Sequence, residues 1–315
     1  MQTGHRFARL PHHAAGVALA IALGSGIAAG QKAPHQGADW SSVDQALGRK
    51  GSAQPGDVMK YSFPRSDLQV TANGVQIKPA LALGSWVAFK RSGASAAMMG
   101  DLVLTEDEIA PVMQALQQGG VEQTALHNHL FGELPRVMYM HVMGHGDAAK
   151  LAQAVRSALG TTKTPLDAPA APASAPAAID LDTAAIASAL GASGKVNGGV
   201  YQVGVPRRER VTDHGMEVPP SMGVATSINF QPTGGGKAAI TGDFVMIARE
   251  VNPVIRALQQ NGITVTALHS HMLTESPRLF FMHFWANDDA VTLAKGLRAA
   301  LDQMAVKTSA KKSGR

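Results

Sequence analysis

Hydrophobic and polar residues alternate along several short stretches of the chain, as they do in strands with one buried face. The alternation on either side of Asn73-Gly74 predicts a β-hairpin, because both central residues of a tight hairpin turn need positive φ angles. Residues 85–90 and 98–104 are expected to form two further strands. These patterns predict a sheet in the first half of the chain.

Helical spacing follows the predicted strands. Thr105 with Glu108 three residues later has the pattern of a capping box, and Gly119-Gly120 ends the helix that it opens. Asp147 is expected to cap a second helix, and a short helix containing Val43 and Leu47 is expected near the start of the repeat. The apolar faces of these three helices are expected to be core faces, formed by Ile109, Val112, Met113 and Leu116, by Ala148, Leu151, Ala152, Val155 and Leu159, and by Val43 and Leu47.

The same order of elements occurs a second time, 142 residues further on. Gly242-Asp243 corresponds to Gly100-Asp101, the helix at 251–258 to that at 109–116, and the helix at 289–301 to that at 147–159. We therefore expect an α+β protein of two homologous tandem domains, each a mainly antiparallel sheet with two to three helices. The two repeats are expected to pack on each other with pseudo-twofold symmetry.

Composition divides the chain further. We assign residues 1–30 to a signal peptide, 41–160 to the first repeat, 161–178 to a Pro/Ala-rich linker, 179–302 to the second repeat and 303–315 to a basic disordered tail. Arg6 and Arg9 precede an apolar run that ends in small residues. This run is shorter than the ~20 residues that span a membrane, and no other stretch is apolar enough. We therefore expect export to the periplasm or beyond, with no membrane span after signal removal.

The formal net charge of +5 arises at the two ends of the chain. Without the two leader arginines and the four basic residues of the last ten, the remaining charge is −1. A nearly neutral body does not favour a phosphate backbone, so we expect no nucleic-acid partner. The chain has no cysteine, which excludes disulfides, thiolate ligands and a lipid-attachment cysteine.

One segment carries most of the candidate chemistry. Residues 124–141 read TALHNHLFGELPRVMYMH, residues 266–283 read TALHSHMLTESPRLFFMH, and ten of the 18 positions are identical. The retained histidines are His127, His129 and His141 in the first repeat and His269, His271 and His283 in the second. Other retained residues are Glu133, Pro135 and Arg136, with Glu275, Pro277 and Arg278.

The spacing of the histidines predicts a metal site. Residues two apart on a strand face the same side, so His127 and His129 project together. If the returning strand places His141 opposite His127, three imidazoles converge on one cation. Such a set binds divalent transition metals, with zinc as the first expectation and manganese or ferrous iron as alternatives. A metal-free polar ligand site and a purely structural hydrogen-bond network remain open.

The retained acidic and basic residues have several readings. Glu133 and Glu275 are candidates for catalytic bases on a metal-bound water, for metal ligands, or for partners that orient a histidine. Arg136 and Arg278 are candidates for binding a small anionic ligand, or for a salt bridge to the neighbouring glutamate. Asp101 and Asp243 either support the histidines or shape the start of a strand. His145 and His214 have no histidine counterpart in the other repeat and are left out of the predicted site.

The whole set of motifs resembles a known family. The Gly-Asp after a strand, the TALHxH hairpin with its E-x-P-R and final His, and the Asp-led helix, all in duplicate, are similar to the LppY/LpqO family of exported bacterial proteins. The resemblance implies export and a duplicated domain, and the activity of that family is unassigned. Some members look like lipoproteins, whereas this chain has no cysteine.

Three functions are consistent with the sequence. The first is an exported protein with a transition-metal site in each repeat that binds, buffers or delivers metal. The second is a metal-dependent enzyme, for instance a hydrolase, in which Glu133 or Glu275 handles the proton of a metal-bound water. The third is a metal-free module for a small ligand. Whether the two hairpins form separate sites or one shared site does not follow from the sequence.

Overall fold

The long strand β6 (Ser95–Thr105) is buried on both faces, and its alternation assigns successive residues to different cores. In the computed structural model, which describes residues 39–93, 95–167 and 178–307, Met98 and Leu102 pack against the helices of their own repeat. Met99 and Val103 face the other way and join clusters that contain residues of the second repeat. The first sheet therefore lies between its own helices and the other half of the protein.

The first repeat contains two sheets. The strands of the larger one are β1 (Ser52–Gln54), β2 (Val58–Pro64), β5 (Gly84–Ser92), β6, β7 (Glu122–His127) and β9 (Val137–Gly146), and those of the smaller one are β3 (Thr71–Ala72), β4 (Val75–Gln76) and β8 (Glu133–Leu134). The larger sheet is antiparallel, in the order β1-β2-β5-β6-β9-β7. The helices are α1 (Ser41–Leu47), α2 (Pro79–Ala82), α3 (Glu106–Gln118) and α4 (Ala148–Leu159).

The second repeat has the same topology. Its larger sheet consists of β10 (Lys195–Asn197), β11 (Val200–Pro206), β14 (Ala225–Gly234), β15 (Lys237–Met246), β16 (Thr264–His269) and β17 (Phe280–Asp289), and its hairpin of β12 (Thr212–Asp213) and β13 (Met216–Glu217). The strand order β10-β11-β14-β15-β17-β16 matches that of the first sheet. The helices are α5 (Thr183–Leu190), η1 (Pro220–Met222), α6 (Ala248–Gln260) and α7 (Ala290–Leu301). The predicted pair of homologous α+β domains is confirmed.

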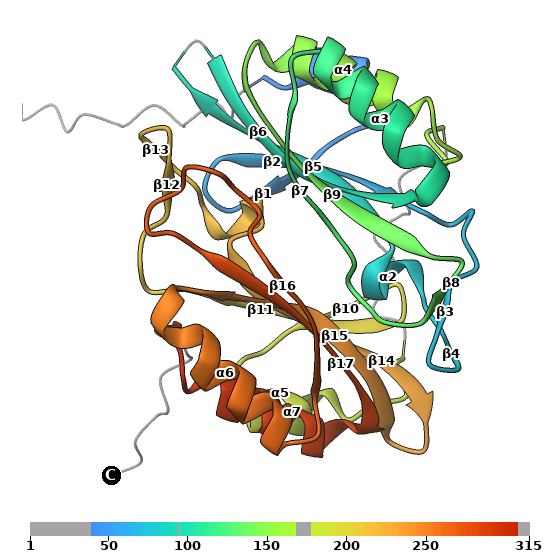
Figure 1. Ribbon diagram of the computed structural model, residues 1–315, viewed down its shortest axis with the longest axis vertical. Coiled ribbons are helices and arrows are strands. Elements are labelled where there is room, and N and C mark those ends of the chain that lie inside the picture. Colours follow the sequence, from blue (N-terminus) through green and yellow to red (C-terminus); the bar gives the residue numbers. More distant parts are fainter. Residues whose placement is uncertain (1–38, 94, 168–177, 308–315) are drawn as a thin grey trace, which may run out of the picture. The chain divides into compact units, whose positions relative to one another are not determined.

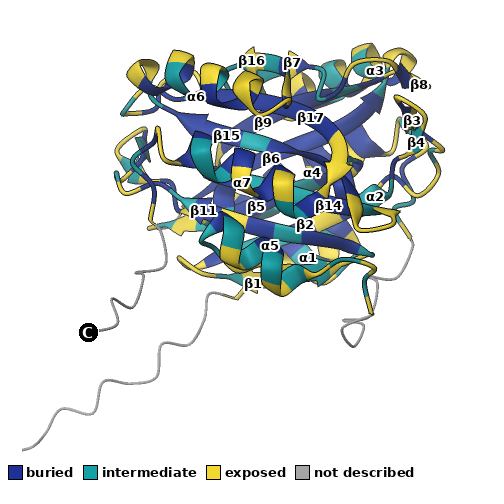
Figure 2. Ribbon diagram, turned by 90° about the horizontal axis from the view of Figure 1, so that it is seen from below, coloured by how far each residue is buried: buried dark blue, intermediate teal, exposed yellow. Residues whose placement is uncertain are grey.

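The two large sheets lie between two helical layers (Figure 1), with α3 and α4 outside one sheet and α5, α6 and α7 outside the other. Residues from both sheets meet in two shared clusters, which bring together, for example, Ala88 and Phe281 in one and Tyr139 and Trp285 in the other. The central strands are largely buried, whereas most exposed positions lie on the helices, the loops and the edge strands (Figure 2). The inner faces of the two sheets therefore form the interface between the repeats.

Local sequence signals have the predicted structural effect. Asn73 and Gly74 have φ angles of 50° and 79° and connect β3 to β4. Glu108 accepts a hydrogen bond from the backbone N–H of Thr105 at 3.0 Å, as the capping box requires. The Asp147 side chain accepts one from the backbone N–H of Lys150 at 2.9 Å and caps α4.

The predicted signal peptide, the middle of the predicted linker and the last eight residues of the predicted tail lie outside the described residues. Within the described ranges, no helix is both long and apolar enough to cross a membrane.

A buried arginine organises the start of the long helix in each repeat. Arg65 has no exposed surface and donates to the Glu108 carboxylate at 2.6 Å and 3.1 Å and to the Val103 carbonyl at 2.7 Å. In the second repeat, Arg207 makes the corresponding bonds to Glu250 and to the Val245 carbonyl. The guanidinium joins the end of a central strand to the helix that follows it.

We expect Arg65→Met to lower the free energy of unfolding by about 3–5 kcal/mol, because Glu108 would keep a buried charge without its partner. Arg207→Met should have a similar effect in the second repeat. Arg136→Met is the control: this side chain is 68% exposed and lies 3.5 Å from Glu106, so we expect a loss below about 1 kcal/mol. Urea denaturation measures all three. Equal effects of Arg65→Met and Arg136→Met would contradict the structural role of the buried pair.

Candidate metal centre

Two cross-strand pairs place a carboxyl group beside a histidine on the inner face of each sheet. Asp101 on β6 lies directly opposite His141 on β9, and Asp243 on β15 lies directly opposite His283 on β17. Directly opposed side chains on one face have Cβ atoms about 4.5–5.5 Å apart. The two aspartates are therefore neighbours of the histidines in mid-strand, and the alternative that they shape a strand start is wrong.

The hairpin register differs from the pairing considered in the sequence analysis, in which His141 would lie opposite His127. His127 pairs with Tyr139, Ala125 pairs with His141, and the second repeat has the same two-residue shift. Strand β7 ends at His127, so His129 lies in the loop that follows. That loop makes its own strand, β8, which pairs with β3 and not with β9. The register of the hairpin therefore depends on a loop that pairs with β3, and the spacing of the histidines did not reveal this pairing.

The first residue of each TALHxH segment links the two repeats. The register shifts at Thr124 and again at Thr266, so each threonine occupies a β-bulge. The Thr124 hydroxyl donates to the His271 carbonyl at 2.6 Å, and the Thr266 hydroxyl donates to the His129 carbonyl. Asn128 also donates its side-chain amide to the Thr266 carbonyl at 3.2 Å. These bonds hold the second histidine of each segment against the opposite repeat.

All six retained histidines gather in one cluster between the repeats. They form three close pairs, and each pair consists of one ring from the first repeat and one from the second. The ring centroids are 3.6 Å apart for His127 and His269, 3.8 Å for His129 and His283, and 3.5 Å for His141 and His271. Within the first repeat the rings are further apart, at 5.3 Å for His127 and His129 and 5.0 Å for His127 and His141. The histidines therefore form one shared centre, which the sequence left undecided.

The two aspartates belong to the same centre. An Asp101 oxygen lies 3.9 Å from Nε2 of His141 and another lies 4.0 Å from Nε2 of His129. Asp243 lies 3.4 Å from Nε2 of His271. Four histidines, His127, His269, His271 and His283, have ring nitrogens within 4.8 Å of one another, a spacing that could hold a metal ion.

Backbone carbonyls orient several of the imidazoles. The Gly242 carbonyl lies 2.7 Å from Nδ1 of His283, and the Asn128 carbonyl lies 3.0 Å from Nδ1 of His127. Because a carbonyl only accepts, Nδ1 carries the proton in both rings, and Nε2 keeps its lone pair. His141 likewise hydrogen-bonds to the Gly100 backbone. This arrangement is the usual one for histidines that bind a metal through Nε2.

Burial changes the protonation of the centre. It lowers the pKa of His127 to about 4 and that of His283 to about 3, and it also lowers the pKa values of the other four rings, where neighbouring imidazoles add to the effect. Burial raises the pKa of Asp101 to about 7, and it raises that of Asp243, to which the nearby Asp101 contributes. The imidazoles are therefore uncharged at neutral pH, the form in which histidine binds metals.

Three residues beside the centre were not predicted from the sequence. The Tyr139 ring stacks on His129 with centroids 3.2 Å apart, and in the second repeat Phe281 stacks on His271 at 3.5 Å. Lys60 lies 3.8 Å above the Trp86 ring, and burial lowers its pKa to about 8, although the opposite charge of Asp101 works against this shift. Tyr139 and Phe281 occupy matching positions of the duplicated segment. An aromatic residue at this position in both repeats is the sequence signal that could have identified them. Lys60 left no such signal.

The retained glutamates and arginines lie in the loops. Glu275 accepts from the Leu279 backbone N–H at 2.9 Å and from Arg278 at 3.2 Å, so the second repeat has the salt bridge that was one reading of the motif. In the first repeat Arg136 contacts Glu106 instead. Glu133 is buried, which raises its pKa to about 8, and its Oε1 has no hydrogen-bond partner.

The chain is thus a duplicated α+β protein with a histidine cluster between its repeats. A family model described as Domain of Unknown Function (DUF1259) matches residues 41–161 and again residues 184–303, and the chain belongs to this family. Comparison with curated proteins gives no match. The finer resemblance to the LppY/LpqO proteins stays a prediction.

Two solved structures are similar over most of the chain. One is a trimeric bacterial microcompartment shell protein, PduB, which is 14% identical, with 81% of this chain and 90% of that chain covered and a TM-score of 0.21. The other is EtuB from Clostridium kluyveri, which is 10% identical, with 80% and 90% covered and a TM-score of 0.18. At these TM-scores the likeness carries no inference about function.

We expect the metal-free protein to become less stable as the pH falls from 7 to 5. The imidazoles of the unfolded chain take up protons near pH 6.5, whereas His127 and His283 stay neutral in the fold until about pH 4 and 3. The unfolded state then holds more protons, and each one lowers the free energy of unfolding by about 1.4 kcal/mol per pH unit.

The buried acids oppose this trend. Asp101, Asp243 and Glu133 have raised pKa values and favour the fold as the pH falls, but the six imidazoles outnumber them. Urea midpoints in EDTA across this pH range measure the net effect. A stability that rises on acidification would contradict the neutral imidazoles.

Proposed function

We propose that this protein binds a divalent transition metal at the histidine cluster between its two repeats. The observation that carries the proposal is a concentration of buried polar atoms without hydrogen-bond partners. Seven of them belong to this one centre: Nε2 of His127, His129, His141 and His283, Nδ1 of His269, and Oδ1 of Asp101 and Asp243. Buried polar atoms are rarely left unpaired, and a cation would satisfy several at once.

The type of donor atom supports zinc first, with manganese and ferrous iron as alternatives. Neutral imidazole nitrogens and carboxylate oxygens suit these ions, and the chain has no thiolate to offer. Zinc–nitrogen bonds of about 2.0–2.1 Å in a tetrahedron put the nitrogens about 3.3 Å apart. Ring nitrogens that already lie within 4.8 Å of one another need only small rotations to reach that geometry.

The electrostatics of the centre favour a cation over a small anionic ligand. Burial raises the pKa values of the Asp101 and Asp243 carboxyl groups, and a metal ion would displace any proton that they hold. The arginines that were candidates for anion binding engage other groups. Arg278 donates to Glu275, and Arg136 lies by Glu106 at a side-chain exposure of 68%.

Binding, buffering or delivery of metal fits these contacts better than catalysis does. A general base on a metal-bound water has to reach that water. The carboxylate of Glu275 is instead occupied by Arg278 and by the Leu279 N–H. The enzymatic alternative therefore rests on Glu133 alone, whose raised pKa, about 8, suits a proton donor more than a base at neutral pH.

Export remains part of the proposal. The basic and apolar leader, and the resemblance of the motifs to the LppY/LpqO family of exported proteins, support a periplasmic or secreted protein. In such a compartment the protein would meet metal ions before they enter the cell.

Elemental analysis of protein purified without a histidine tag tests the proposal. After treatment with EDTA and dialysis against zinc, manganese or ferrous iron, wild type should retain at least one equivalent of metal. His127→Gln with His269→Gln should retain at least one equivalent less, because these two rings lie at the centre of the cluster. Zinc at 100 times its dissociation constant should also stabilise wild type by about 2.7 kcal/mol.

Tyr139→Phe is the matched control, since the second repeat has Phe281 at that position, and it should bind metal as wild type does. Circular dichroism shows whether the double variant is folded. Wild type without stoichiometric metal, or a folded double variant with a full complement, would refute the proposal.

A further inference from the structure

A second cluster of metal-binding side chains lies apart from the six histidines. His145 near the end of β9, with Asp213 and His214 at the β12–β13 turn, has ligand atoms within 4.8 Å of one another. The rings of His145 and His214 have centroids 4.8 Å apart and come from different repeats. Both histidines are exposed, whereas Asp213 is buried.

The duplication shows that the fold does not require these residues. The position equivalent to His145 in β17 is Asn287, and the position equivalent to His214 in the β3–β4 turn is Asn73. His214 keeps the left-handed backbone of that turn, with φ of 46° against 50° for Asn73. Asparagine and histidine both tolerate this conformation, so the turn itself does not select histidine.

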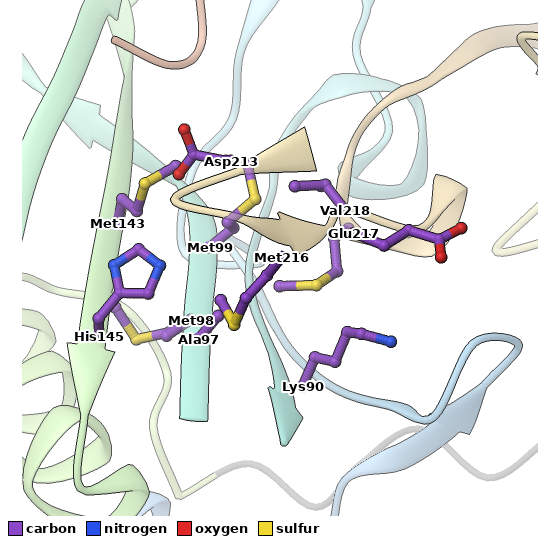
Figure 3. A pocket seen from close by; sticks show the side chains of 11 residues that line it. Lys90, Ala97, Met98, Met99, Met143, His145, Asp213, Met216, Glu217 and Val218 are labelled. Atoms are coloured by element: carbon purple, nitrogen blue, oxygen red, sulfur yellow. The ribbon is translucent and has the colours of Figure 1, made fainter. Parts of the chain in front are cut away.

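A sulfur-lined cavity adjoins the cluster. His145 and Asp213 line it together with Met99, Met143, Met216 and Met222, while Met98, which also borders it, packs against the helices of its own repeat. Its volume is about 10 Å³, close to that of one water-sized sphere. Figure 3 shows His145, Asp213 and the labelled methionines around the same space. Lys90 and Glu217 also line it.

Asp213 holds His214 in place. One Asp213 oxygen lies 2.9 Å from Nδ1 of His214, and the other accepts from the Thr274 hydroxyl at 2.7 Å. In the neutral ring, Nδ1 therefore donates to the carboxylate and Nε2 of His214 keeps its lone pair. The other repeat has alanine, Ala72, where Asp213 stands, so this support is also present only once.

We propose that His145, His214 and the thioethers of this cavity form a second metal site, selective for Cu(I). Methionine sulfur is a soft ligand that favours Cu(I), and imidazole also binds copper. The six-histidine cluster offers nitrogen and oxygen, which suit zinc, so the two sites differ in the ions they select. Asp213 supplies a negative charge beside the single positive charge of the ion. This assignment does not depend on metal at the six-histidine cluster.

The site is tested by anaerobic competition for Cu(I) against bicinchoninate, with the full chain and no tag. Wild type should withdraw one equivalent of Cu(I). His145→Asn with His214→Asn introduces the residues that the other repeat has at these positions and preserves the turn. This variant should bind Cu(I) at least tenfold more weakly. Met99→Leu with Met143→Leu keeps the core volume and should also weaken it at least tenfold.

Controls separate the two centres. Zinc retention at the six-histidine cluster should be the same in these two variants and wild type, and His127→Gln with His269→Gln should retain its Cu(I). X-ray absorption of the copper-loaded protein should contain both sulfur and nitrogen scatterers. Unchanged Cu(I) affinity in the asparagine variant, or copper bound without sulfur, would overturn the proposal.

Discussion

The packing of the two sheets depends on six imidazoles that carry no charge. They lie between the repeats at ring separations down to 3.5 Å, where six positive charges would repel one another with little water to screen them. Burial keeps the pKa values of these rings low, and the Nδ1–carbonyl bonds fix the proton of His127 and His283 on one nitrogen. The same neutrality that permits this burial presents lone pairs to a cation. The packing of the interface and the proposed metal binding thus have one physical cause.

Duplication explains how one centre arises from two hairpins. Each repeat brings an aspartate and a histidine on paired strands, and a threonine at a β-bulge that bonds to the opposite repeat. The symmetry is not complete. The position of Tyr139 is occupied by Phe281 in the second repeat, and of the two loop glutamates that of the second repeat is the one paired with its neighbouring arginine. His145, Asp213 and His214 beside the methionine-lined cavity correspond to Asn287, Ala72 and Asn73 in the other repeat, which indicates that the repeats diverged where the shared centre does not restrict them.

Much of the fold was readable from local signals. Asn73-Gly74 formed its hairpin, Thr105 and Asp147 began their helices, and the 142-residue offset correctly predicted a second copy of the domain. These features depend on backbone conformations and side-chain bonds within a few residues, so sequence spacing is sufficient for them. The strand register was wrong by two residues because the intervening loop pairs with β3, a partner about sixty residues away.

From the sequence alone came the identities of the six histidines, the retained Glu, Pro and Arg residues, and the existence of two copies. Only the tertiary structure decided that the copies share one centre, because the closest histidine pairs join residues more than 100 positions apart and result from two sheets packing face to face. It also decided that Asp101 and Asp243 lie among the rings, and that His145 meets His214 beside a group of methionines. Such meetings depend on which faces of two separate sheets come together, and no local pattern of residues specifies that.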